Sequence, residues 1–170
     1  MTIISNHGRG YSNIRPELNG EVYFLGLWAK EMECRAEPAM VLDVGANEGD
    51  FADLVLQKRD AVTIHCFEPN PTTAARLSRR FQHDVRVNVH NLALGENEGS
   101  ITLYDQSGRE GTGVATAIHE VFTDVYKREM AAITVPMWNI DRFMETNNIR
   151  KIDLVTGNPV FFWLQPAPKA

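Results

Sequence analysis

The feature that most constrains this chain is VLDVGANEGD at residues 41–50, where an apolar run ends in an acidic residue and a glycine-rich turn. A second apolar run, IHCFEPNP at residues 64–71, ends on Glu68. The residues between the two runs are compatible with a helix, so the pattern is strand, turn, helix and strand. Such a unit places its strands in parallel and brings both acidic residues to the carboxyl edge of the sheet. The pattern predicts an α/β fold that presents an adenosine-type ligand at this edge.

Periodicity predicts the remaining elements around these two strands. Apolar residues at helical or alternating spacing predict helices at 21–33, 51–58 and 71–81 and strands at 40–44, 62–67 and 85–89. Alternation at 101–104 and 133–137 predicts two strands of an antiparallel excursion. A glycine-rich stretch and a helical pattern at 118–125 lie between them, and a helix at 141–148 and a strand at 151–155 follow. We expect a loose lead-in at 1–20, one domain at 21–155 and an atypical tail at 156–170.

Composition narrows the classes of function. A chain of 170 residues with 44% hydrophobic residues suits one domain with a substantial core, and its net charge of -5 argues against nucleic-acid or membrane partners. No run has the length of a signal peptide core or a membrane span, which predicts a soluble, cytoplasmic protein.

Cys34 and Cys66 lack zinc spacing, so no metal site is predicted, and Cys66 is expected to be buried. Arg76, Arg79 and Arg80 are interpreted as a solvated helix face.

The glycine turn predicts how a ligand is held. Gly45 and Gly49 lack the β-carbon that obstructs close approach, and amides at the following helix start can donate hydrogen bonds. Asp43 is placed to receive an ammonium group. Glu68 ends the next strand, where such folds place a carboxylate that accepts both hydroxyls of a ribose.

The glycine spacing distinguishes between cofactors. A nicotinamide dinucleotide fingerprint requires G-x-G-x-x-G, whereas Asn47 occupies the position of the middle glycine. A pyrophosphate therefore fits poorly, which disfavours a nicotinamide-dependent reductase. A ligand without phosphates fits better, and the spacing favours S-adenosylmethionine.

Five segments in order resemble the FkbM-type S-adenosylmethionine-dependent methyltransferases: VLDVGANEGDFA, CFEPNP, NLALGENEGSITLY, NIDRF and IRKIDLV. The resemblance implies a Rossmann-like methyltransferase fold, mostly parallel with helices on both faces and an antiparallel insertion. It also implies O-methylation of a hydroxyl on a sugar or other small metabolite. By this resemblance the methionine moiety is surrounded by Asp43, Gly45, Ala46, Asn47 and Gly49, the ribose by Glu68, Pro69 and Asn70, and the adenine by Asn91 and Leu92.

The chain departs from the family after the last segment. In the family a K-x-D-x-E-G-x-E-like motif follows IDL and borders the reaction centre, whereas here the residues read VTGNPVFF. Lys151 to Asp153 can be matched to the start of that motif instead, but the glutamate is then absent, and the first alignment is favoured. Either alignment predicts that the C-terminal strands are missing, and that catalytic competence is reduced. The alternative function is a non-catalytic methyltransferase-like remnant that binds a partner through apolar residues 161–164.

Several residues have simpler interpretations. Glu68 can cap the helix that begins after Pro71, and Asn91 can be a turn former. His65 lies within a strand and is expected to be structural, whereas His90 at a strand end is the histidine best placed to reach the pocket. No residue is nominated as the catalytic base.

Overall fold

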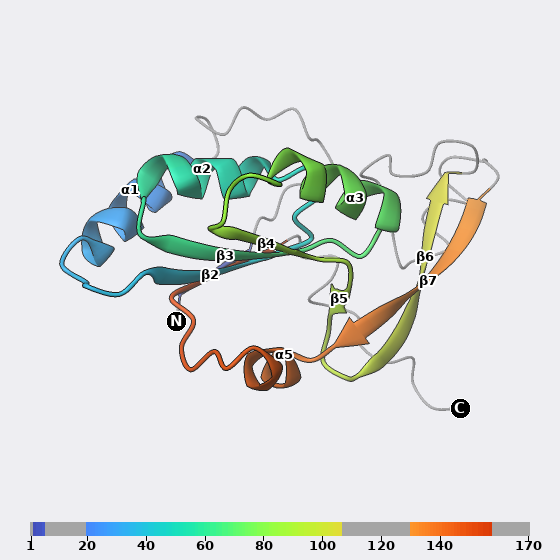
Figure 1. The fold of residues 1–170 in the computed structure, drawn as a ribbon. Coiled ribbons are helices and arrows are strands. Elements are labelled where there is room, and N and C mark those ends of the chain that lie inside the picture. Colours follow the sequence, from blue (N-terminus) through green and yellow to red (C-terminus); the bar gives the residue numbers. More distant parts are fainter. Residues whose placement is uncertain (1, 6–19, 107–129, 158–170) are drawn as a thin grey trace.

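The computed structural model describes residues 2–5, 20–106 and 130–157. Within these ranges the strands form a five-stranded sheet of order β1-β8-β2-β3-β4 and a three-stranded sheet of order β5-β7-β6. Helices α1, α2 and α3 cover one face of the larger sheet, and α5 lies on the other face beside the smaller sheet (Figure 1). The elements in chain order are β1 (Thr2–Ser5), α1 (Glu21–Met32), β2 (Ala39–Val44), α2 (Asp50–Lys58), β3 (Val62–Phe67), α3 (Pro71–Arg80), β4 (Val87–His90), β5 (Ala93–Leu94), β6 (Gly99–Gln106), β7 (Met130–Trp138), α5 (Ile140–Thr146) and β8 (Leu154–Gly157).

All neighbouring strands of the larger sheet are parallel, so the ends of β2 and β3 meet at one edge. Asp43 of β2 lies opposite Cys66 of β3 on one side and opposite Thr156 of β8 on the other. β4 pairs with the far side of β3, with His90 opposite Phe67. This register brings the turn after β2 beside the loop after β3.

Two apolar cores flank the sheet, because successive side chains of a strand point to opposite faces. On the first face, Val41 and Ile64 pack with Leu25, Val55 and Leu77 from the three helices. On the second face, the core contains strand residues, residues of the smaller sheet and a phenylalanine of α5, namely Leu42, Val44, Phe67, Leu103, Val135, Phe143 and Val155. The helices on the two faces confirm the predicted layered α/β fold.

Most of the predicted elements are confirmed. The helices at α1, α2 and α3, the strands β2 and β3 and the antiparallel pairing of β6 with β7 follow the predicted pattern. Cys66 is buried, as expected. The helix predicted at 118–125 and the tail from residue 158 lie outside the described residues.

Several boundaries differ from the predictions, most clearly at the start of β4, at the start of β8 and at Thr2–Ser5. Val85 is 95% exposed and precedes β4, because Asp84 Oδ1 accepts a hydrogen bond from the Arg86 amide at 3.0 Å and closes a turn there. The last strand begins at Leu154 rather than at residue 151. Thr2–Ser5 form a strand parallel to β8 rather than part of a loose lead-in.

Within the described ranges, no helix combines the length and the apolar content that crossing a membrane would require.

Candidate cofactor-binding site

The turn after β2 is tied to the end of β3 by backbone hydrogen bonds. The amides of Gly45 and Ala46 both donate to the Phe67 carbonyl, at 2.8 and 3.0 Å. The Gly49 amide donates to the Ala46 carbonyl at 2.8 Å, and the Asn47 amide donates to Glu68. These four amides are therefore engaged within the protein, and they fix the turn instead of facing a ligand.

Gly49 is required by packing as well as by backbone conformation. Its φ of +89° lies in the left-handed region that favours glycine. A β-carbon here would lie 2.5 Å from Cε2 of Phe81 and 2.6 Å from Cδ1 of Leu77. The sequence pattern suggested close approach of a ligand, whereas the structure shows close approach of α3 and the residue that follows it.

Asn47, at the position of the middle glycine of a dinucleotide fingerprint, adopts a left-handed conformation with a φ of +49°. Asparagine tolerates this region better than other residues with a side chain. Its side-chain Oδ1 is buried without a hydrogen-bond partner among the described residues. A buried acceptor of this kind is suited to a ligand that brings a donor.

Glu68 connects the two strand ends through its carboxylate. It is only 6% exposed, and it accepts hydrogen bonds from the Asn70 amide on Oε1 and from the Asn47 amide on Oε2, both at 2.9 Å. Burial raises the pKa of this carboxyl although the two amides and the charge of Arg76 oppose the change, and the negative charge of Asp105 adds to it. Each oxygen retains a further lone pair, so the carboxylate can still accept two hydroxyl groups.

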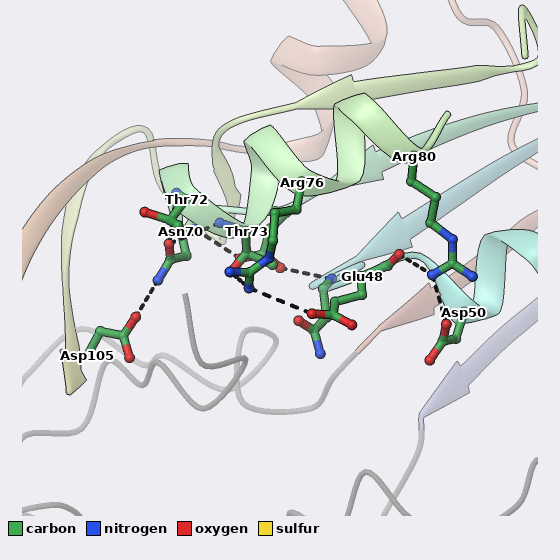
Figure 2. A network of polar contacts seen from close by, with 10 residues as sticks. Glu48, Asp50, Asn70, Thr72, Thr73, Arg76, Arg80 and Asp105 are labelled. Carbon is green, nitrogen blue, oxygen red and sulfur yellow. Dashed lines mark hydrogen bonds and ion pairs between the residues drawn. The ribbon is translucent and has the colours of Figure 1, made fainter. Parts of the chain in front are cut away.

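Asn70, and not Glu68, caps α3. Its Oδ1 accepts hydrogen bonds from the amides of Thr72 and Thr73 at 3.0 and 3.3 Å, and Pro71 follows in the first turn. Its Nδ2 donates to Oδ2 of Asp105 at 2.7 Å, as the left side of Figure 2 shows. Asn70 and Asp105 are 1% and 0% exposed. Asp105 is the site residue that the sequence analysis missed, because nothing in its local pattern connects it to residue 70.

The other predicted residues lie around Glu68 with different roles. Asn91 donates from Nδ2 to the carbonyls of Glu68 and Pro69, each at 2.9 Å, so its side chain holds this loop. Leu92 is 9% exposed and packs in the second core. Asp43 is buried at the end of β2, and its charge adds to burial in raising the pKa of the Cys66 thiol.

The basic cluster of α3 is more than a solvated helix face. Arg80 forms ion pairs with Asp50, at 2.8 Å, and with Asp53, and it donates to the Glu48 carbonyl. Arg76 lies 3.7 Å from the Glu48 carboxylate (Figure 2). These contacts connect α3 to the start of α2. Their side chains are at least one-third exposed, so each pair contributes little to stability by itself.

The two strand histidines form a pair. His65 Nδ1 and His90 Nε2 are 2.8 Å apart, and both rings contact Phe143. Burial, assisted by the neighbouring His90, lowers the pKa of His65 to about 4, and burial also lowers the pKa of His90. His65 is thus structural, as expected, and the Nε2 atom of His90 is engaged by its partner.

Asp153 lies at the opposite edge of the sheet. Its Oδ1 contacts Arg35 and Lys151 at 2.5 and 2.6 Å, and its Oδ2 accepts from the amide of Met40, near the start of β2, at 3.0 Å. Asp153 therefore precedes β8 at the amino edge and lies away from Glu68. In the first of the two alignments the residues matched to the family's motif begin at Val155, within β8, and this alignment stays a prediction.

The parallel sheet, with acidic residues at the ends of two adjacent strands, defines a Rossmann-like α/β domain. The family model described as "Methyltransferase FkbM domain" matches residues 43–156. The chain therefore belongs to the FkbM family of S-adenosylmethionine-dependent methyltransferases.

Three individual proteins are similar to parts of this chain. The 2-O-methyltransferase NoeI of Sinorhizobium fredii (strain NBRC 101917 / NGR234) is 32% identical over 69 residues, which are 41% of this chain and 28% of that protein. The SAM-dependent methyltransferase from Agrobacterium tumefaciens aligns with a TM-score of 0.36 and 8% identity over 47% of this chain and 25% of its own. The plantazolicin methyltransferase BpumL in complex with SAH aligns with a TM-score of 0.31 and 10% identity over 54% of this chain and 50% of its own.

Proposed function

We propose that this chain binds S-adenosylmethionine and transfers its methyl group to a hydroxyl oxygen of a sugar or another small metabolite. Family membership supports the reaction class, and the similarity to a 2-O-methyltransferase supports a hydroxyl acceptor. The observation that carries the proposal is the buried Glu68 carboxylate at the carboxyl edge of the sheet, held by two backbone amides. This arrangement leaves acceptor capacity that matches a pair of adjacent hydroxyls.

The residues present fit this cofactor. Glu68 would accept the two ribose hydroxyls, with Pro69 and Asn70 continuing that wall of the site. Asp43 and the buried Oδ1 of Asn47 would face the ammonium group of the methionine moiety, which brings donors to both acceptors. Gly45 and Ala46 would complete the wall of the methionine moiety, Gly49 would hold that turn against α3, and Asn91 and Leu92 would flank the adenine.

The contribution of this chain to catalysis is positioning. A bound cofactor would supply an electrophilic methyl group on a sulfonium, and in the transfer the carbon–sulfur bond would be replaced by a carbon–oxygen bond while the hydroxyl proton passes to solvent. The residues proposed for the site would hold the methionine moiety and the ribose and so place the sulfonium in line with the acceptor. Such alignment is a large part of catalysis for a reaction that needs no covalent enzyme intermediate.

A calorimetric titration with S-adenosylhomocysteine tests the binding step. We expect micromolar affinity for the wild-type chain and a loss of about 100-fold for Glu68→Ala, because two hydrogen bonds to a charged group are removed. Asp60→Asn, at an exposed position, is the matched control. If Glu68→Ala is shown to be folded and its affinity for S-adenosylhomocysteine is unchanged, the assignment of Glu68 to the ribose is wrong.

A second assay tests the transfer step. The wild-type chain is incubated with S-adenosylmethionine labelled on the methyl group and a panel of sugars with free hydroxyls, and labelled products are separated. Label on a sugar oxygen supports the methyltransferase. Binding of S-adenosylhomocysteine without any transfer across the panel would favour the non-catalytic, methyltransferase-like alternative.

A further inference from the structure

Asp105 is a completely buried carboxylate that comes from the smaller sheet. It lies near the end of β6, which pairs antiparallel with β7, where Asp105 is opposite Ala131. Its Oδ2 is 2.7 Å from Nδ2 of Asn70, at the start of α3 on the larger sheet. The two sheets are therefore joined at the loop that follows β3.

The contact continues through Asn70 to the cofactor carboxylate. The side chain of Asn70 caps α3, while its backbone amide donates to Oε1 of Glu68. The other oxygen of Glu68 accepts from the amide of Asn47 in the glycine turn. Asp105, Asn70, Glu68 and Asn47 thus form one continuous series of hydrogen bonds, and we call these four residues the carboxylate relay.

The geometry fixes which atoms of Asn70 face which partners. Asn70 Oδ1 accepts from two amides of α3, so the amide group must present Nδ2 on the other side. A carboxylate is an acceptor only and matches that donor. Without an acceptor at residue 105, a buried amide group would lack a partner for Nδ2, which is unfavourable enough to displace the side chain.

We propose that Asp105 is a positioning residue for the cofactor's ribose, because it fixes Asn70 and, through Asn70, the orientation of the Glu68 carboxylate. The inference rests on the proposed function, since it assigns Glu68 to the ribose. It adds a residue of β6 to a site otherwise built from the loops after β2, β3 and β4. The smaller sheet is thereby coupled to cofactor affinity.

Hydrogen exchange measured by NMR on the ligand-free chain tests the relay without any cofactor. Asp105→Ala should increase exchange about tenfold at the amides of Asn47, Asn70, Thr72 and Thr73, as expected for the loss of one charged hydrogen bond. The Arg59 amide, bonded to Val55 within the α2 end, is the internal control and should not change. Unchanged exchange at the amides of Asn47, Asn70, Thr72 and Thr73 would overturn the proposal, whether or not the wild-type chain binds a cofactor.

Calorimetry with S-adenosylhomocysteine then tests the consequence for binding. Asp105→Ala should weaken binding about tenfold, whereas Asp105→Asn should remain within about threefold, because its side-chain oxygen can still accept from Asn70. Affinity close to that of the wild type in Asp105→Asn, together with a loss in Asp105→Ala, would show that the hydrogen bond to Asn70 matters and not a general disturbance of the fold. Equal losses in the two variants would contradict the proposal.

Exchanging the two partners gives the sharpest test. Asn70→Asp alone sets two carboxylates against each other and should weaken binding by more than about tenfold. The double variant Asn70→Asp with Asp105→Asn restores a cap for α3 and a donor facing an acceptor, so affinity should recover to within about threefold of the wild type. Absence of recovery in a folded double variant would refute the relay. Absence of S-adenosylhomocysteine binding by the wild-type chain would instead refute the proposed function. The hydrogen-exchange measurement by NMR would still test whether Asp105 fixes Asn70.

Discussion

The two edges of the larger sheet carry buried carboxylates that are held in opposite ways. At the carboxyl edge, Glu68 accepts hydrogen bonds from two backbone amides, and burial raises its pKa. At the amino edge, Asp153 is held by Arg35, Lys151 and the amide of Met40, and these partners lower its pKa although burial opposes them. The side chain of Asp153 is 8% exposed, so the difference does not arise from burial alone.

The difference separates a structural contact at Asp153 from the proposed binding residue Glu68. A carboxylate with cationic partners has its charge already compensated, and it stabilises the chain by joining β8 to β2. A carboxylate held only by backbone amides, with its charge opposed by burial, gains most from a partner that arrives later. Three measurements test this comparison.

The largest effect is expected at Gly49, on the carboxyl edge. Gly49→Ala forces a β-carbon to within 2.6 Å of side-chain atoms of Phe81 and Leu77, in a left-handed backbone. We expect a loss of about 3 to 4 kcal/mol in the free energy of unfolding, measured with urea. Gly26→Ala is the control, because nothing lies within 4 Å of its β-carbon position in α1, and it should stabilise by about 0.5 to 1 kcal/mol. Similar values for the two variants would show that packing does not fix the carboxyl-edge turn.

The pH dependence of stability should come next. The folded state lowers the pKa of His65 from 6.5 to about 4, so the unfolded chain binds more protons between these values and stability falls as pH falls. We expect the contribution of His65 to the free energy of unfolding to be about 2 kcal/mol smaller at pH 5 than at pH 7.5. The raised pKa of Glu68 contributes in the opposite direction at the acid end of this interval. The pKa of Asp153 is lowered from its ordinary value of 3.8. The stability that its ionised form contributes is therefore lost only below pH 3.8, outside this interval.

The variant His65→Gln isolates this contribution. Its stability should vary less between pH 7.5 and pH 5, with the remaining slope due to His90, whose pKa burial also lowers. Because the raised pKa of Glu68 contributes with the opposite sign, the difference between the wild-type and His65→Gln profiles, and not the wild-type slope alone, measures the contribution of His65. A slope that persists in full in His65→Gln would assign the effect to other groups.

The smallest effect is expected at Asp153. Asp153→Asn removes the charge that holds Arg35 and Lys151 but keeps an acceptor for the Met40 amide, so we expect a loss of about 1 to 2 kcal/mol in stability. Affinity for S-adenosylhomocysteine should stay within about twofold, because the residue lies at the other edge of the sheet. Asp60→Asn is again the exposed control. A marked loss of affinity in Asp153→Asn would remove the distinction between the two edges.

Local sequence patterns predicted the elements that depend on neighbouring residues. Pro71 is typical of the first turn of a helix, and α3 begins there, although the residue that caps it is Asn70 and not Glu68. The apolar runs at β2 and β3 marked buried parallel strands with acidic residues at or just after their ends. The boundary at Val85 was wrong, because the alternation of three valines resembled a strand whereas the Asp84 side chain closed a turn in front of it.

The order of the elements and the presence of a carboxylate at or just after the end of each of two adjacent strands follow from the sequence alone, because backbone preference and periodicity are local properties. Tertiary packing sets the hydrogen bond from Asn47 to Glu68, 21 residues away, and the one from Asn70 to Asp105, 35 residues away. It also decided that Thr2–Ser5 pair with β8 and that His65 faces His90. Such contacts follow from sheet register and from how the layers pack, and these depend on residues far apart in the chain rather than on any local pattern.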